Sequence, residues 1–128
     1  MESSDFCTIT NKTKGKLPSL PFVSIKNTIL GEKYELSISF ISTAKQKEIN
    51  STYKKIHKTT NVLSFPLSKK SGEITFDLAT IKKEAPLFKM RYSKFLKYLL
   101  IHGLLHLKGF KHSSTMEEAE EKFLNLFS

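Results

Sequence analysis

An eleven-residue segment, HGLLHLKGFKH from His102 to His112, constrains the fold of this chain more than any other part of it. Four residues along a helix correspond to about 400° of rotation, so His102 and His106 are expected one turn apart on nearly one face. Gly109 lets the chain leave the helix through a left-handed conformation. His112 can then turn back toward the first two histidines. The spacing therefore predicts a helix that stops at Gly109 and three imidazoles around one small cation.

The residues before this segment predict the strongest helix of the chain, from Lys94 to Lys108, with Ser93 as its N-cap. Its apolar positions follow the three-four spacing of a helix that packs on a core. These positions are Phe95, Leu96, Leu99, Leu100, Gly103, Leu104 and Leu107. Two of the three histidines therefore belong to a helix that the core holds in place.

Three neutral imidazoles leave one position of a divalent metal open for water, which is typical of a catalytic zinc. A structural zinc needs a fourth protein ligand, and the lone cysteine, Cys7, is remote in the chain. Zinc lowers the pKa of its bound water to about 7, which favours hydrolysis. Three imidazoles also suit nickel, copper or iron. The segment thus predicts a catalytic metal centre, with zinc as the first choice.

The spacing H-x-x-x-H-x-x-G-x-x-H is also the ligand frame of the metzincin peptidases. In zinc peptidases a glutamate follows the first histidine and works as the general base. Here that residue is Gly103, which cannot move a proton. The sequence therefore predicts a metzincin-like metal frame without the peptidase machinery.

The rest of the chain alternates between strand and helix patterns. Strands are predicted at residues 5–10, 34–41, 61–66 and 73–78. Because the connection between the last two is short, they are expected to be antiparallel neighbours or close partners in the sheet. Further helices are predicted at residues 23–30, 43–56, 80–85 and 115–127. Phe65 and the other aromatic residues are expected in the core. A length of 128 residues and 39% hydrophobic residues predict a single domain, 1–128.

The chain is strongly basic, with 21 Lys and Arg against 12 Asp and Glu and a net charge of +9. This excess favours a polyanionic partner and leaves nucleic acid, acidic lipid and acidic protein open. The single cysteine suits a reducing compartment. The first ten residues, MESSDFCTIT, lack the basic start and apolar stretch of a signal peptide, and the apolar runs are far shorter than a membrane span. We therefore expect a cytoplasmic protein with no membrane partner.

Two blocks of this sequence resemble the YbeY family of bacterial endoribonucleases: TNVLSFP at residues 60–66 and HGLLHLKGFKH at residues 102–112. The likeness extends through residues 49–53, 72–74 and 84–85 and the acidic C-terminal helix. It implies an α+β fold, with a small mixed β-sheet of about four strands flanked by helices. It also implies one zinc ion per chain, held by His102, His106 and His112.

The resemblance further implies a single-strand-specific, metal-dependent endoribonuclease that acts on ribosomal RNA. Its roles would be maturation of the 3′ end of small-subunit RNA and ribosome quality control, with the ribosome or its small subunit as a partner and no DNA substrate. A functionally important arginine of the family aligns with Lys54, in INSTYK. Lysine keeps the positive charge but loses the bidentate fork of an arginine. Lys54 is the candidate catalytic residue, and Lys54, Lys55 and Lys58 are candidates for RNA binding.

Two more positions depart from the family pattern: Lys111 and Glu73 each replace an aspartate. Because Lys111 stands before the last histidine, any carboxylate that orients an imidazole must come from elsewhere. Residues 45–70 hold seven lysines and one acid, Glu48, which is consistent with an RNA groove that leads to the metal or with a solvated lysine-rich surface. His57 is expected in an exposed loop.

Alternatives to a ribonuclease stay open from the residues alone. A ribosome assembly factor with a structural zinc would use the same ligands, and the ligand frame by itself would suit a metallopeptidase, against which Gly103 argues. A polybasic membrane-surface protein is the weakest alternative, because the chain has no strongly amphipathic basic helix.

Overall fold

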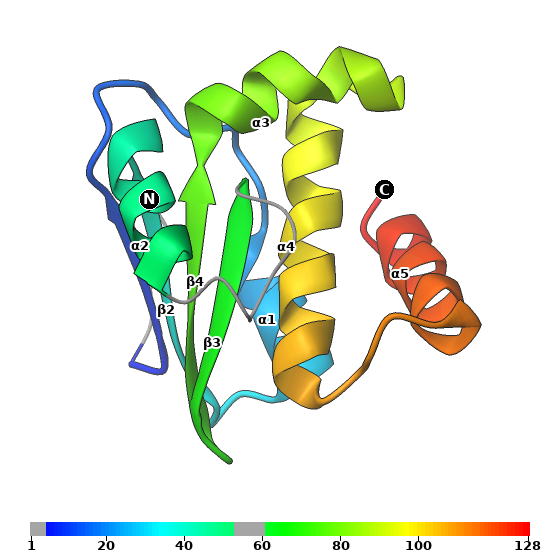
Figure 1. The fold of residues 1–128 in the computed structure, drawn as a ribbon. Helices are drawn as coiled ribbons and strands as arrows, with labels where there is room; N and C mark the ends of the chain where they lie inside the picture. Colours follow the sequence, from blue (N-terminus) through cyan, green and yellow to red (C-terminus); the bar gives the residue numbers. More distant parts are fainter. Residues whose placement is uncertain (1–4, 53–60) are drawn as a thin grey trace.

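The computed structural model describes residues 5–52 and 61–128 (Figure 1). Within them, one sheet has the strand order β1-β2-β4-β3 and is accompanied by helices. The strands are β1 (Cys7–Asn11), β2 (Glu35–Ile41), β3 (Val62–Ser68) and β4 (Ser71–Asp77). The helices are α1 (Phe22–Leu30), α2 (Thr43–Thr52), α3 (Leu78–Glu84), the 3-10 helix η1 (Ala85–Phe88), α4 (Tyr92–Lys108) and α5 (Ser114–Leu126).

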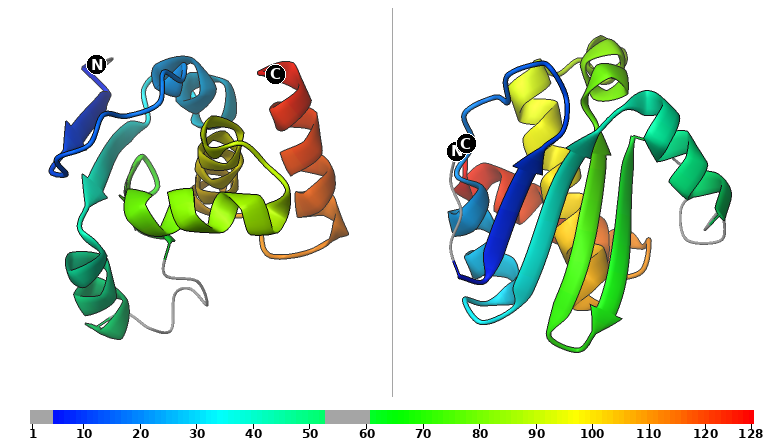
Figure 2. Two further views of the ribbon diagram at one scale, coloured as in Figure 1. Left: turned by 90° about the horizontal axis from the view of Figure 1, so that it is seen from above. Right: turned by 90° about the vertical axis from the view of Figure 1, so that its left-hand side faces the viewer.

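The sheet is mixed, as predicted. β1 pairs with β2 and β2 pairs with β4 in parallel, whereas β3 and β4 form an antiparallel hairpin. Helices α1 and α4 lie behind the sheet in the right-hand view of Figure 2, while α3 runs across one end. The expectation of an α+β fold with a small mixed sheet of four strands is confirmed.

The core lies between the sheet and helices α1 and α4. Along β2, Leu36, Ile38 and Phe40 are buried while the intervening Ser37 and Ser39 are half-buried, which is the period-two alternation of a strand with one apolar face. The ring of Phe40 stacks on Phe76 of β4 at a centroid distance of 5.2 Å. This packing fixes the sheet on which α4 rests.

Several helix starts differ from the prediction, and side-chain caps set those of α3 and α5. Ser93 is not the N-cap of α4, which begins at Tyr92 after a turn in which Lys89 adopts a left-handed conformation with a φ of 56°. Asp77 caps α3 by accepting from the Thr80 amide at 3.1 Å. Ser113 caps α5, which therefore begins at residue 114. The predicted end of α2 near residue 56 lies outside the described residues.

The expectation that the aromatic side chains pack in the core is wrong for part of them. Phe65 is half-buried, and the side chains of Phe6 and Phe88 are 36% and 55% exposed. Leu126, in the last turn of α5, is 62% exposed. None of the helices within residues 5–52 and 61–128 combines the length and apolar character needed to cross a bilayer.

Candidate metal centre

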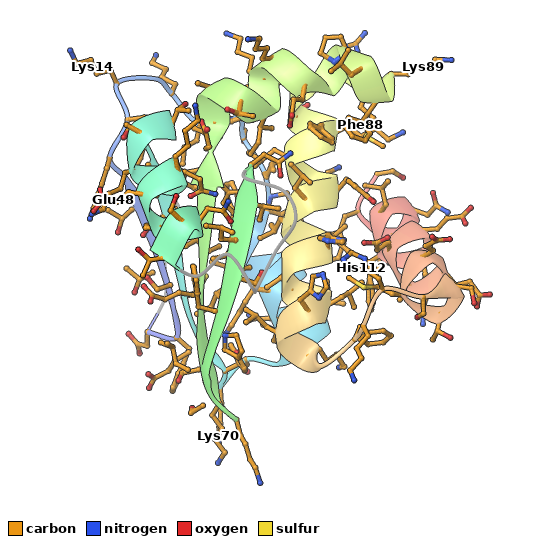
Figure 3. All side chains as sticks on the ribbon, in the orientation of Figure 1. Lys14, Glu48, Lys70, Phe88, Lys89 and His112 are labelled. Carbon is orange, nitrogen blue, oxygen red and sulfur yellow. The ribbon has the colours of Figure 1, made fainter. Side chains whose placement is uncertain are left out.

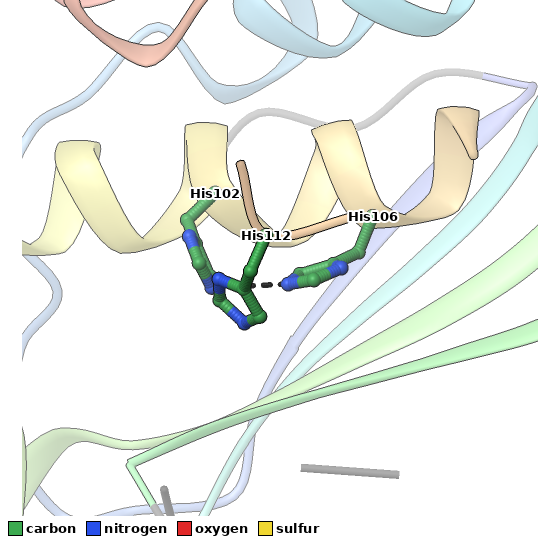
Figure 4. A group of neighbouring side chains, drawn as sticks. All are labelled: His102, His106 and His112. Atoms are coloured by element: carbon green, nitrogen blue, oxygen red, sulfur yellow. Dashed lines mark hydrogen bonds between the residues drawn. The ribbon is translucent and has the colours of Figure 1, made fainter. Parts of the chain in front are cut away.

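Three histidine rings face one another beside α4 (Figure 4). The ring centroids of His102, His106 and His112 form a triangle with sides of 4.6, 4.8 and 5.2 Å. The Nε2 atoms of His102 and His106 are 3.1 Å apart, and one nitrogen from each of the three rings lies within 4.8 Å of the others. His102 and His106 are half-buried and His112 is exposed, so the cluster is open on the side of His112.

The turn after α4 brings His112 to the other two histidines. Gly109 has a φ of 111°, which L side chains rarely adopt, and its amide donates to the carbonyl of His106 at 3.0 Å. The amide of Phe110 donates to the carbonyl of Leu105 at 3.0 Å. These two bonds satisfy the last carbonyls of the helix while the chain reverses. The left-handed exit predicted at Gly109 is confirmed.

The arrangement fits a small divalent cation. With zinc–nitrogen bonds of about 2.0–2.1 Å in a tetrahedral site, two ligand nitrogens lie about 3.3 Å apart. The 3.1 Å between the Nε2 atoms of His102 and His106 is close to this separation, and a small movement of His112 completes the set. Imidazole nitrogen is a ligand that zinc and its neighbours in the first transition series prefer. The three side chains could therefore hold a metal ion.

A buried carboxylate supports the first of these histidines. Glu120 of α5 hydrogen-bonds to Nδ1 of His102, and the side chains of Glu120 and His102 are 8% and 13% exposed. A partner at Nδ1 leaves Nε2 free to face the cluster. Burial, the negative charges of Glu120 and Glu117 and a hydrogen bond to Glu120 raise the pKa of Tyr98, so its phenol stays protonated and donates to this carboxylate. Glu120 therefore fixes both the tautomer and the orientation of His102.

Glu120, one of the four glutamates of α5, was not predicted as a functional residue. A signal for it exists, because Glu120 follows Met116 by four residues and so shares the buried face of this helix. Glu117, Glu118 and Glu121 are exposed. The carboxylate that orients an imidazole, which was expected from a residue other than Lys111, thus comes from α5.

Gly103 lets α4 approach the sheet closely. A Cβ atom at this position would lie 3.0 Å from Ser64 Oγ and 3.1 Å from Ile74 Cδ1. The hydroxyl of Ser64 also donates to the carbonyl of Gly103 at 3.2 Å. A peptidase glutamate at position 103 would therefore meet the sheet, so the close packing at Gly103 argues against the metallopeptidase alternative.

Residues 61–66, the described part of the block TNVLSFP, support α4 and α3. The Ser64 hydroxyl of β3 donates to the carbonyl of Gly103, which lies between the two helical histidines. Asn61 is buried, and its amide donates to the Glu84 carboxylate at 2.8 Å, which ties the start of β3 to the end of α3. These residues therefore have a structural role that no local sequence pattern indicated.

The predicted RNA-binding residues Lys54, Lys55 and Lys58, and also His57, lie outside the described residues. Lys45 lies on α2, 3.6 Å from the Glu48 carboxylate, and Lys70 lies at the tip of the β3–β4 hairpin, well away from His112 (Figure 3). Both lysines are exposed. The RNA groove along residues 45–70 stays a prediction, because its central lysines lie outside the described residues.

Comparisons with known proteins agree with the resemblance. The family model described as Endoribonuclease YbeY matches residues 9–127. The protein named Endoribonuclease YbeY of Caldicellulosiruptor saccharolyticus is 35% identical over 98 residues, which cover 63% of this chain and 62% of that protein. The protein of the same name of Aliarcobacter butzleri is 32% identical over 110 residues, which cover 81% of this chain and 77% of that protein. This chain therefore spans less than two thirds of the first relative's length.

The fold is similar to the solution structure of TM1509 from Thermotoga maritima. The two share 25% sequence identity with a TM-score of 0.62, and the match covers 93% of this chain and 87% of that one. The sheet and the helices around the three histidines therefore recur in a solved structure.

Proposed function

Because this chain belongs to the YbeY endoribonuclease family, we propose that it is a metal-dependent endoribonuclease that cleaves single-stranded RNA. In this proposal residues 1–128 act as one cytoplasmic nuclease domain. Ribosomal RNA, including the 3′ end of the small-subunit RNA, is the substrate, and the small ribosomal subunit is the partner. Maturation and quality control of ribosomes are the processes it serves.

The cluster of His102, His106 and His112 is the observation that carries the proposal. Its three nitrogen donors suit zinc and leave a coordination position for a further ligand, as a catalytic site requires. A closed structural site would need a fourth protein ligand. In the part of the chain that the structure describes, the group of potential ligands is these three histidines alone, which favours catalysis over the assembly factor with a structural zinc.

A bound zinc would supply Lewis acidity, which lowers the pKa of a water molecule and polarises a phosphoryl oxygen. The protein side chains position this chemistry. His102 and His106 would hold the ion from α4, and the hydrogen bond of Glu120 to Nδ1 of His102 turns its Nε2 toward the cluster. His112 closes the set from the loop after Gly109. Its exposed side leaves an approach for the phosphodiester backbone of RNA.

Lysine side chains supply the positive charge for the backbone in this proposal. Lys54 stands at the family's arginine position and binds a phosphate near the scissile bond, while Lys55 and Lys58 bind neighbouring phosphates. An ammonium group acts as a point charge and not as a bidentate fork. We therefore expect Lys54→Ala to lower kcat/KM and Lys54→Arg to raise it.

The test is cleavage of a labelled single-stranded RNA by pure protein loaded with zinc, compared with the same RNA annealed to its complement. We expect cleavage of the single strand, loss of cleavage with a chelator, and no cleavage by His106→Ala. Metal analysis provides the matched control, because His57→Ala should keep the metal that His106→Ala loses. Retained cleavage in metal-free protein would indicate a contaminating ribonuclease.

Two results would overturn the proposal together: intact RNA after incubation with zinc-loaded protein, and unchanged small-subunit RNA 3′ ends in cells that carry His106→Ala. If the histidine variants lose metal and stability together while folded variants still bind ribosomes, the assembly factor replaces the nuclease.

A further inference from the structure

One exposed aromatic ring has no role in the site described so far. Phe88 ends the 3-10 helix η1, and its side chain is 55% exposed; the neighbouring Leu87 is 79% exposed. Ala85 takes the buried position of this short helix, whereas Leu87 and Phe88 are largely exposed. Large apolar side chains that stand together at a surface often mark a place where another molecule binds.

The ring of Phe88 is held in position from one side. It stacks on Phe95 of α4 at a centroid distance of 4.8 Å and an interplanar angle of 22°, and Phe95 itself is buried. The turn that follows is fixed by two backbone bonds, from the Lys89 amide to the Pro86 carbonyl and from the Met90 amide to the Ala85 carbonyl, at 3.0 and 3.1 Å. Phe95 therefore covers one face of the Phe88 ring and holds the ring in position, and the remainder of the ring is exposed to solvent.

The segment of the chain that contains this ring is positively charged. Residues 82–97, all of which the structure describes, contain six cationic side chains and one carboxylate, Glu84. That carboxylate accepts a hydrogen bond from Asn61 and is half-buried. Lys97 is engaged with the carbonyl of Phe127 at 2.6 Å. We name the η1 corner as Phe88 together with the exposed cations within six residues of it. These are Lys82, Lys83, Lys89, Arg91 and Lys94.

An exposed aromatic ring among cations is the combination by which proteins bind single-stranded nucleic acid. A base stacks on the ring while the positive charges bind the adjacent phosphates. A protein partner would favour a different surface, because lysine is depleted in the cores of protein interfaces. The composition of the η1 corner therefore favours RNA over a second protein.

The corner is also connected to the histidine cluster through α4. Phe95, Tyr98 and His102 follow one stripe of this helix, with centroid distances of 6.4 and 6.2 Å between successive rings. Phe95 and His102 are seven residues apart, which is about 10 Å along the helix axis. A stacked strand advances about 3.4 Å per nucleotide, so a base on Phe88 lies about three or more nucleotides from a phosphate at the histidines.

We propose that the η1 corner is a second RNA-binding site, in which Phe88 stacks on a base of the single-stranded substrate several nucleotides away from the cleaved bond. This inference rests on the proposed function for the identity of the ligand and deepens it. Figure 3 shows Phe88 and Lys89 at the end of η1, beside the N-terminal half of α4. His112 follows α4 in the chain and lies beside a later part of that helix. This second site would make the enzyme prefer RNA that is long enough to contact both the η1 corner and the histidine cluster.

The test compares rings with an aliphatic side chain at position 88. Phe88→Leu keeps an apolar contact with Phe95 but removes the π-face, and Phe88→Tyr keeps the ring. Binding of a single-stranded RNA of about twelve nucleotides is measured by fluorescence anisotropy, with each variant placed in the non-cleaving His106→Ala protein and at several salt concentrations. Leu67→Ala serves as the control, because Leu67 is 62% exposed on β3, outside the η1 corner.

We expect Phe88→Leu to weaken RNA binding by about five- to 150-fold, the range that loss of one stacked base gives, and to raise KM in the zinc-loaded enzyme. Phe88→Tyr and Leu67→Ala should bind like the parent protein. Arg91→Ala should reduce the slope of log affinity against log salt by about 0.7, as loss of one phosphate contact to a single strand does. Thermal unfolding of each variant verifies that it is folded.

The two proposals fail in different ways. If Phe88→Leu binds RNA as tightly as Phe88→Tyr, the η1 corner is not an RNA site and its apolar side chains serve a protein partner. If the zinc-loaded enzyme cleaves no RNA but binding still depends on the ring at position 88, the proposed nuclease is wrong and the RNA site stands.

Discussion

Replacement of Glu120 tests whether the buried carboxylate tunes the metal centre or merely joins two helices. Its side chain is 8% exposed, it hydrogen-bonds to His102 Nδ1, and it accepts from Tyr98. Removal of such a partner of a ligating histidine costs about 10- to 100-fold in metal affinity, or about 1.4–2.8 kcal/mol. Glu120→Gln retains an oxygen acceptor and should lie near the lower limit. Glu120→Ala leaves two buried donors unpaired and should lie near the upper limit.

The assay is competition for zinc between the protein and a chelator of known affinity. Glu121→Gln is the matched control, because Glu121 is the next residue of α5 and is exposed. Thermal unfolding of the metal-free proteins separates the two roles, since a purely structural contact lowers the melting temperature without changing zinc affinity. Equal zinc affinity in Glu120→Ala, Glu120→Gln and Glu121→Gln would refute the assignment of Glu120 as a positioning residue.

Three further predictions follow from the glycine turn, the core and a buried lysine. Gly109→Ala should lower the free energy of unfolding by about 1–2 kcal/mol and weaken zinc binding, because a φ of 111° strains an L residue and the strain displaces His112. The measurements are urea unfolding and zinc titration. Gly15→Ala is the control, because Gly15 has open space around it and no such φ. Phe40→Ala should lower the free energy of unfolding by about 3–5 kcal/mol in urea, since this ring is fully buried; a cost below about 1 kcal/mol would contradict the packing. Burial lowers the pKa of Lys26 from 10.5, so between the pKa of the folded state and 10.5 the unfolded chain binds more protons than the folded one. The free energy of unfolding should therefore rise with pH in that window. In Lys26→Met this rise of the urea midpoint with pH should vanish.

Local sequence patterns predicted much of this fold because they act over a few residues. The alternation along 34–41 identified β2, the three-four spacing identified α4, and the short connection identified the β3–β4 hairpin. Helix starts were less predictable. Ser93 has the side chain of an N-cap, but the left-handed turn at Lys89 delivers the chain to α4 two residues earlier, with Arg91 at the cap position.

The histidine cluster itself was predictable because helix geometry and one glycine fix it within eleven residues. The described residues bring His102, His106 and His112 together as the spacing predicted. Its support was not predictable in the same way. Ser64 reaches α4 from a strand 39 residues away, and Glu120 reaches His102 from another helix. Such contacts depend on how the elements pack, which no local pattern encodes.

The sequence by itself determined the three histidines that could hold a metal ion, the order of strands and helices along the chain, and the absence of a general base at Gly103. Tertiary structure decided which of the acidic residues in α5 supports a ligand, why position 103 must be small, and which aromatic ring stays at the surface. The physical reason is the separation in sequence over which each interaction acts. Helix periodicity and glycine conformation act between neighbours, whereas burial of Glu120 and exposure of Phe88 follow from the packing of α5 and η1 against α4.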